Sequence, residues 1–161
     1  MTGLRPERAT DAGSIAAVLN AAFGSSGGGG EPSAEAALVD QLRREGDIDL
    51  SLVAVGDDGG IVGHAALSPL AAPFPALALA PVAVEPGHQG QGIGSALVGA
   101  ALAARPGHTV VVLGEPRFYS RFGFRPVGWD CPYAGPFLQA TGPHMPDHAR
   151  IAYAPAFSAL G

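Results

Sequence analysis

A glycine-rich turn between an apolar strand and an apolar helix constrains this chain more than any other feature. The spacing of apolar residues predicts a buried strand over Leu77 to Glu85, a loop over Pro86 to Gln91 and a helix from about Gly92 to Ala104. The first N–H groups of such a helix have no partner within it, and the peptide dipoles add partial positive charge there. Glycines also let the backbone approach an anion closely. The segment predicts a phosphate-binding cradle, with a plain connecting turn as the alternative.

Two common phosphate-binding motifs do not match this turn. A Walker loop needs a lysine after its last glycine, and the chain has no lysine. A dinucleotide fingerprint needs Gly-x-Gly-x-x-Gly, but its third glycine position holds Ser95 when counted from Gly90 and Leu97 when counted from Gly92. The spacing therefore disfavours a nucleotide-binding oxidoreductase.

The remaining sequence predicts a mixed α/β fold in a single domain over residues 1–161. The strand, helix and following strand predict a right-handed βαβ unit with parallel strands. A turn at Asp57 to Gly60 predicts an antiparallel hairpin before it. The other expected elements are a strand at Leu4 and Arg5, helices over Thr10 to Phe23 and from Ser33 to near Gly46, hairpin strands over Leu50 to Val55 and Ile61 to Ser68, a rigid loop over Pro69 to Pro75, strands over Thr109 to Leu113, Phe124 to Val127 and Ala149 to Tyr153, and a short helix over Pro116 to Phe122.

Charge and composition exclude several classes of function. The net charge is −5 and all basic residues are arginines, so the chain lacks the basic stripe of a nucleic-acid-binding protein. Ala65 to Val84 has no charge, but its four prolines argue against a membrane-spanning helix. Cys131 is the sole cysteine and residues 1–8 do not resemble a signal peptide, so we expect a cytoplasmic protein.

Two motifs together resemble the GNAT superfamily of N-acyltransferases. Gln89, Gly92 and Gly94 form the pattern Gln-x-x-Gly-x-Gly of that family's acetyl-CoA pyrophosphate loop. The segment Val110 to Phe124 resembles the family's strand, short Phe-Tyr helix and Gly-Phe turn, at the usual separation from the first motif. The resemblance covers nearly the whole chain and is strongest from Leu50 to Val127.

This resemblance implies a splayed, mixed and mostly antiparallel sheet with helices on both faces, and acetyl-CoA as cosubstrate without a metal. The strand that ends at Glu85 would pair with the pantetheine, and the loop would hold the pyrophosphate. The acetyl-CoA-binding residues that the resemblance implies are Val82, Val84, Gln89, Gly90, Gln91, Gly92, Ile93, Gly94 and Ser95.

Three residues are candidates for catalysis. By resemblance, Tyr119 in the Phe-Tyr helix is the acid that protonates the leaving thiolate, with a packed aromatic residue as the alternative. Glu85 and His64 are candidates for the base that takes the amine proton, or else a solvated loop acid and a structural histidine. His144, Asp147 and His148 superficially resemble metal ligands but lie in a proline-broken segment without supporting partners.

The resemblance implies direct acetyl transfer to a primary amine of a small molecule, or of a peptide or protein, in a ternary complex. The alternative is a non-catalytic acyl-CoA-binding or sensor domain, which would not need Tyr119. The relatives imply a monomer or homodimer. The glycine-rich stretch over Gly24 to Gly30 is interpreted as a mobile lid or as a surface linker.

Overall fold

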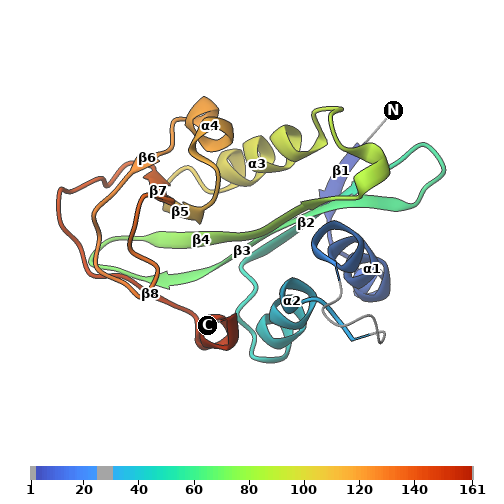
Figure 1. Cartoon of the computed structure of the whole chain (residues 1–161), viewed down its shortest axis with the longest axis horizontal. Coiled ribbons are helices and arrows are strands. Elements are labelled where there is room, and N and C mark those ends of the chain that lie inside the picture. The colour runs from blue at the N-terminus through green and yellow to red at the C-terminus, as the bar shows by residue number, and fades with distance from the viewer. Residues whose placement is uncertain (1–2, 25–30, 161) are drawn as a thin grey trace.

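The computed structural model describes residues 3–24 and 31–160, so the possible lid mostly lies outside the described residues. Figure 1 shows a long sheet with helices on both sides. The elements in chain order are β1 (Gly3–Pro6), α1 (Ala12–Phe23), α2 (Ala34–Arg44), β2 (Leu50–Val55), β3 (Ile61–Ala71), β4 (Ala76–Val84), α3 (Ile93–Ala104), β5 (Thr109–Leu113), α4 (Pro116–Tyr119), β6 (Arg125–Pro126), β7 (Leu138–Thr141) and β8 (Ala152–Tyr153), with short 3₁₀ turns at Ala9–Asp11, Pro86–His88, Ser120–Phe122 and Pro155–Leu160.

The sheet is mixed and mostly antiparallel, as the sequence predicts. Its strand order is β1-β2-β3-β4-β5-β7-β6, and β8 pairs with the end of β3. The pair β4 and β5 is parallel, and α3 connects these two strands, whereas the other pairs among the described strands are antiparallel. The βαβ unit therefore lies in the middle of the sheet.

The two parallel strands separate after a short contact. Residues 76–78 of β4 pair with residues 109–111 of β5. Beyond this point β4 continues along β3 as far as Val84, while Val112 and Leu113 of β5 pair only with β7. Peptide groups of β4 that face the gap therefore lack a strand partner on that side, which leaves them available to a ligand.

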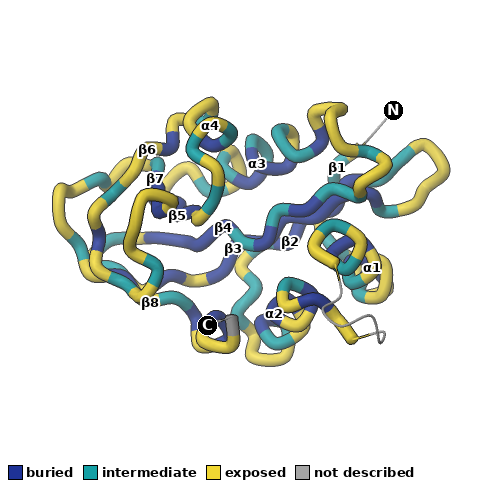
Figure 2. The backbone as a smooth tube through the Cα atoms, in the orientation of Figure 1, coloured by how far each residue is buried: buried dark blue, intermediate teal, exposed yellow. Residues whose placement is uncertain are grey.

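Apolar side chains on each sheet face hold a separate helical layer. On one face Ile93, Leu97 and Val98 of α3 pack against the strands. On the other face Ile15 and Leu19 of α1 pack with α2 over Val53 and Ala83, and further residues of α2 join the C-terminal segment. Figure 1 shows α3 and α4 on the side of the sheet opposite to α1 and α2, and Figure 2 shows the buried strands between these layers. Any ligand that passes through the gap between β4 and β5 would contact both layers.

The structure differs from the sequence-based expectation mainly after Ser68. The predicted loop from Pro69 is wrong in its first part, because β3 continues to Ala71 and pairs there with β8. Strand β7 and the C-terminal 3₁₀ turn were not predicted, and the predicted last strand is reduced to Ala152–Tyr153. The uncharged segment that ends at Val84 forms strands, and no helix among the described residues is long and apolar enough to cross a membrane.

Candidate active site

The loop after β4 folds back onto the end of the strand. A 3₁₀ turn over Pro86–His88 begins it, and the Gln89 side-chain amide donates to the Val84 carbonyl oxygen at 3.1 Å. Gly90 and Gly92 have φ angles of 80° and 82°. Because side chains other than glycine rarely adopt such angles, these glycines allow the sharp approach to α3.

The start of α3 carries no group that would compete with an anion. Gly92 is its N-cap and supplies no side-chain hydrogen bond, and the first turn has no acidic residue. The backbone hydrogen bonding of the helix begins with the Ala96 N–H, which donates to the Gly92 carbonyl at 3.0 Å. The preceding N–H groups of the first turn therefore remain available, together with the positive end of the helix dipole.

A cavity of about 620 Å³ opens over this turn. It extends from the exposed edge of β4, across the start of α3, to the short helix α4. All the acetyl-CoA-binding residues expected from the sequence line it except Gln91, which is exposed. The lining residues are Val82, Val84, His88, Gln89, Gly90, Gly92, Ile93, Gly94, Ser95, Glu115, Phe118, Tyr119 and Arg121.

The wall opposite the α3 backbone is aromatic and positively charged. The Arg121 guanidinium lies 4.7 Å from the centre of the Phe118 ring. A Cβ atom at Gly94 would lie 3.7 Å from both Phe118 Cζ and Val84 Cγ2, which is ordinary contact. A methyl group at Gly94 would therefore fit the protein while occupying space in the cavity.

Tyr119 lies at the inner end of this cavity. Its side chain is 9% exposed and packs edge-on against Phe118 and Phe124, with ring centres 4.9 and 5.5 Å away. Gly114 permits this position, because a Cβ atom there would lie only 2.4 Å from Tyr119 Cε2. Burial raises the pKa of the Tyr119 phenol, so the hydroxyl stays protonated near neutral pH.

A second cavity of about 320 Å³ lies on the α2 side of the gap. Val82 and Tyr119 line both cavities, so the two meet where β4 and β5 separate. The other lining residues of this second cavity are Phe23, Glu35, Leu38, Leu79, Ala80, Pro81, Leu113, Tyr133, Tyr153 and Phe157.

Three aromatic rings from the C-terminal region form one wall of the second cavity. Tyr153 stacks edge-on with Tyr133 and contacts Phe157, each at 5.0 Å between ring centres. The Tyr133 hydroxyl donates to the Phe157 carbonyl oxygen at 2.8 Å, which fixes this wall. The Tyr153 hydroxyl is buried and has no hydrogen-bond partner in the described part of the chain.

Comparisons with known proteins agree with this arrangement. Residues 49–126 match the family described as acetyltransferase (GNAT) domain. Over 127 residues the chain is 39% identical to the uncharacterized N-acetyltransferase YhbS of Escherichia coli K12, covering 75% of this chain and 72% of that protein. The chain belongs to the GNAT acetyltransferase family.

Solved structures of GNAT proteins share the fold along almost the full length. The E. coli YhbS structure, in complex with CoA, has a TM-score of 0.82 and 31% identity, covering 99% of this chain and 93% of that chain. A GNAT acetyltransferase of Brucella melitensis, in complex with acetyl-CoA, has a TM-score of 0.79 and 34% identity, covering 98% of each chain. The splayed sheet of this GNAT protein is therefore the family fold.

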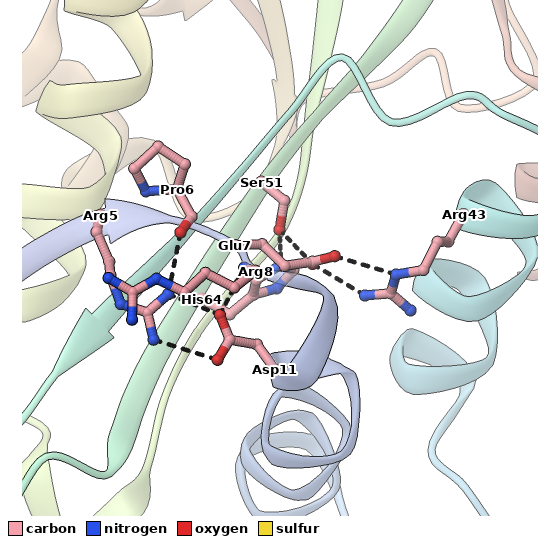
Figure 3. Close-up of polar contacts among 8 residues, drawn as sticks. All are labelled: Arg5, Pro6, Glu7, Arg8, Asp11, Arg43, Ser51 and His64. Carbon is pink, nitrogen blue, oxygen red and sulfur yellow. Dashed lines mark hydrogen bonds and ion pairs between the residues drawn. The ribbon is translucent and has the colours of Figure 1, made fainter.

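His64 of this GNAT protein lies in a buried polar network away from both cavities. It faces α1 and α2, because its neighbour Gly63 faces α3. Figure 3 shows His64 beside Ser51, with Glu7 and Arg43 beyond. His64 Nε2 lies 2.9 Å from Ser51 Oγ, which donates to Glu7 Oε1 at 2.7 Å, and Arg43 pairs with the same carboxylate at 2.9 Å. The network joins α2 to strands β2 and β3.

The direction of these hydrogen bonds defines the protonation of His64. Because Ser51 donates its proton to Glu7, its oxygen must accept from the Nε2–H of His64. His64 Nδ1 is buried without a partner among the described residues, so a second proton there would be an unpaired charge. Burial accordingly lowers the pKa of His64 to about 4. His64 is a neutral histidine that stabilises the fold.

Glu85 lies outside both cavities as well. It ends β4, is 42% exposed at its side chain, and lies 3.7 Å from His88 Nδ1. It lines a shallow surface pocket beside α1 with Pro86 and Gly87. Neither candidate base is therefore placed to contact an amine in the gap between β4 and β5. The described residues also include no group of three or more His, Cys, Asp or Glu side chains that could hold a metal.

The sequence analysis missed the residues of the second cavity. Glu35 looked like an ordinary first-turn acid of a helix, and Tyr133, Tyr153 and Phe157 lie in a proline-rich tail with no periodic pattern. The only available signal was the unusual density of aromatic residues in that tail. Their meeting with α2 depends on the pairing of β8 with β3.

Proposed function

We propose that this GNAT acetyltransferase transfers the acetyl group of acetyl-CoA directly to a primary amine in a ternary complex. The observation that carries the proposal is that two cavities from opposite faces of the sheet meet at Val82 and Tyr119. One cavity suits the cosubstrate and the other suits the acceptor. The two reactants can then meet without a covalent enzyme intermediate.

The α3-side cavity has the chemistry that acetyl-CoA requires. The available N–H groups at the start of α3 and the Arg121 guanidinium suit phosphate oxygens. Gly90, Gly92 and Gly94 keep side chains away from that position. The unpaired edge of β4 suits the amide groups of the pantetheine. The solved GNAT relatives with CoA and with acetyl-CoA support this assignment.

Tyr119 is the residue that we assign to the chemical step. Acetyl-CoA supplies an activated thioester. As the amine nitrogen bonds to the carbonyl carbon and the carbon–sulfur bond breaks, Tyr119 donates its phenolic proton to the departing sulfur. The proton released by the amine restores the phenol through solvent. The raised pKa of Tyr119 keeps this proton in place before the step.

The proposal is tested by calorimetric titration of the full chain with acetyl-CoA, with NAD as the control ligand. We expect binding of acetyl-CoA but not of NAD, and release of free thiol when primary amines are added. The absence of acetyl-CoA binding at physiological concentrations would overturn the proposal. Binding without thiol release from any amine would favour the acyl-CoA sensor instead.

A further inference from the structure

The acceptor-side cavity combines an apolar lining with a single charged side chain. Its lining consists of aliphatic and aromatic residues, apart from the carboxylate of Glu35. A cavity of this composition excludes an anionic acceptor group, because the group would be desolvated beside a like charge. It suits a molecule with an apolar body and a positive charge.

Glu35 has no partner within the protein. Other carboxylates on or near α2 are paired, since Asp40 binds Arg44 and Glu7 binds Arg43. Glu35 forms neither a hydrogen bond nor an ion pair with any residue in the ranges 3–24 and 31–160. Its charge therefore remains available to a ligand in the cavity.

The aromatic wall provides a second attraction for a cation. The rings of Tyr133, Tyr153 and Phe157 pack together beside the cavity. Aromatic faces attract ammonium groups. The buried Tyr153 hydroxyl, which has no partner among the described residues, also offers an oxygen that can accept an N–H hydrogen bond. These features independently point to the same kind of ligand as Glu35 does.

Glu35 and Tyr119 come from opposite sides of the sheet. Figure 1 shows α2, which carries Glu35, on one side and α4, which carries Tyr119, on the other. The amine that reacts must reach the junction at Val82 and Tyr119. The group held by Glu35 therefore lies at the other end of the acceptor.

We infer that the acceptor is a dication: a primary amine linked through an apolar body to a second cationic group, which Glu35 and the aromatic wall bind. This inference rests on the proposed acetyl transfer and names its substrate class. Glu35 acts as a specificity-determining residue and takes no part in proton transfer at the reacting nitrogen. Its effect should therefore fall on KM rather than on kcat.

The test compares three acceptors of matched length: 1,5-diaminopentane, pentylamine and 5-aminopentanoate. They differ only in a terminal ammonium, methyl or carboxylate group. With the full chain and saturating acetyl-CoA, we expect kcat/KM to fall in that order, by about tenfold or more between the first two, as for a hydrogen bond to a charged group. Binding of each amine to the CoA-loaded protein, measured by calorimetry, should follow the same order.

Substitutions at Glu35 complete the test. Glu35→Gln should remove the preference for the diamine by raising its KM, and Glu35→Arg should shift the preference toward 5-aminopentanoate. Glu31→Gln, at an exposed carboxylate outside the cavity, removes the same charge and should leave the preference unchanged. Acetyl-CoA affinity should be the same in all variants.

Equal use or equal binding of the three amines by the wild type would overturn the inference, as would a diamine preference that survives Glu35→Gln. Both results are distinct from failure of the proposed function, which would appear as the absence of acetyl-CoA binding. If acetyl-CoA binds but no amine is acetylated, the calorimetric order of the amines decides the inference by itself.

Discussion

The first turns of α2 and α3 each border one of the two cavities, and they differ in every feature that selects the charge of a ligand. Ser33 caps α2 by accepting from the Ala36 N–H at 3.0 Å, and Glu35 adds a negative charge. The first turn of α3 has neither a capping side chain nor an acid. Two helix starts with the same backbone dipole thus offer a carboxylate in one case and bare N–H groups in the other.

This contrast shows that a helix terminus becomes an anion site only when its own side chains leave it open. At α2 the backbone donors are satisfied from within the protein, so the ligand meets the carboxylate. At α3 the donors are left to the ligand. The four predictions below test this division between the cavities and the residue at which they meet.

The largest effect is expected at Tyr119, where the two cavities join. Tyr119→Phe keeps the ring but removes the proton donor, so kcat should fall by about a hundredfold to ten-thousandfold. Acetyl-CoA affinity should not change, because the backbone of α3 is unaffected. Thiol release at saturating substrates measures the first quantity and calorimetry the second. A decrease of less than threefold in kcat would remove Tyr119 from the chemical step.

The next effect concerns the network that joins α2 to the sheet. The pKa of His64 is about 4 in the folded protein, compared with about 6.5 in an unfolded chain. Between these values the unfolded state binds more protons, so stability is full above pH 6.5 and is lost as the pH falls toward 4. The loss should reach about 3 kcal/mol at pH 4, at 1.36 kcal/mol per pKa unit.

Denaturant unfolding from pH 7 to pH 4 measures this loss. His64→Gln removes the titrating group and should flatten the profile between pH 6.5 and pH 4. His148→Gln, at an exposed position, is the matched control and should keep the wild-type slope. An unchanged slope in His64→Gln would show that other groups, such as Glu7, dominate acid unfolding.

A smaller effect is expected when the open helix start is narrowed. Gly94→Ala adds a methyl group that the protein accommodates at 3.7 Å but that enters the cavity. If a phosphate lies there, acetyl-CoA should bind about tenfold more weakly, through loss of one charge-assisted hydrogen bond. Gly99→Ala, in the same helix with open space around its Cβ, should leave the affinity unchanged. Equal affinities in the two variants would place the phosphate elsewhere.

The smallest effect is expected when the capped helix start is opened. Ser33→Ala leaves the buried Ala36 N–H without its partner and should cost about 1 kcal/mol of unfolding free energy. Acetyl-CoA affinity should be unchanged, since α2 does not border the α3-side cavity. Urea unfolding measures the stability. Weaker acetyl-CoA binding in this variant would contradict the independence of the two helix starts.

The sequence was sufficient to predict the cosubstrate side of the site because that side is local. The strand, Gln89, the glycines and the first turn of α3 are contiguous, and their geometry depends on short-range turns and helix hydrogen bonds. The sequence also predicted the parallel pairing of β4 and β5, since a strand-helix-strand segment has one favoured handedness. The residues assigned there lie together in the α3-side cavity.

The acceptor side was not predictable, because its residues are brought together from distant parts of the chain. Glu35 meets Tyr153 and Phe157 only after β8 has paired with the unexpected extension of β3. The direction of His64 was ambiguous for a related reason. Register shifts in β3, opposite both β2 and β4, disturb the simple alternation of side chains.

The sequence by itself thus determined the family, the order of the main elements and the backbone cradle, all of which depend on interactions between near neighbours. Only the tertiary structure decided that His64 is a buried structural residue, that Glu85 lies outside the cavities, and that Glu35 faces an aromatic wall. Backbone donors act wherever the local chain places them. A side chain acquires its role from the distant residues that desolvate it, pair with it or leave it unpaired.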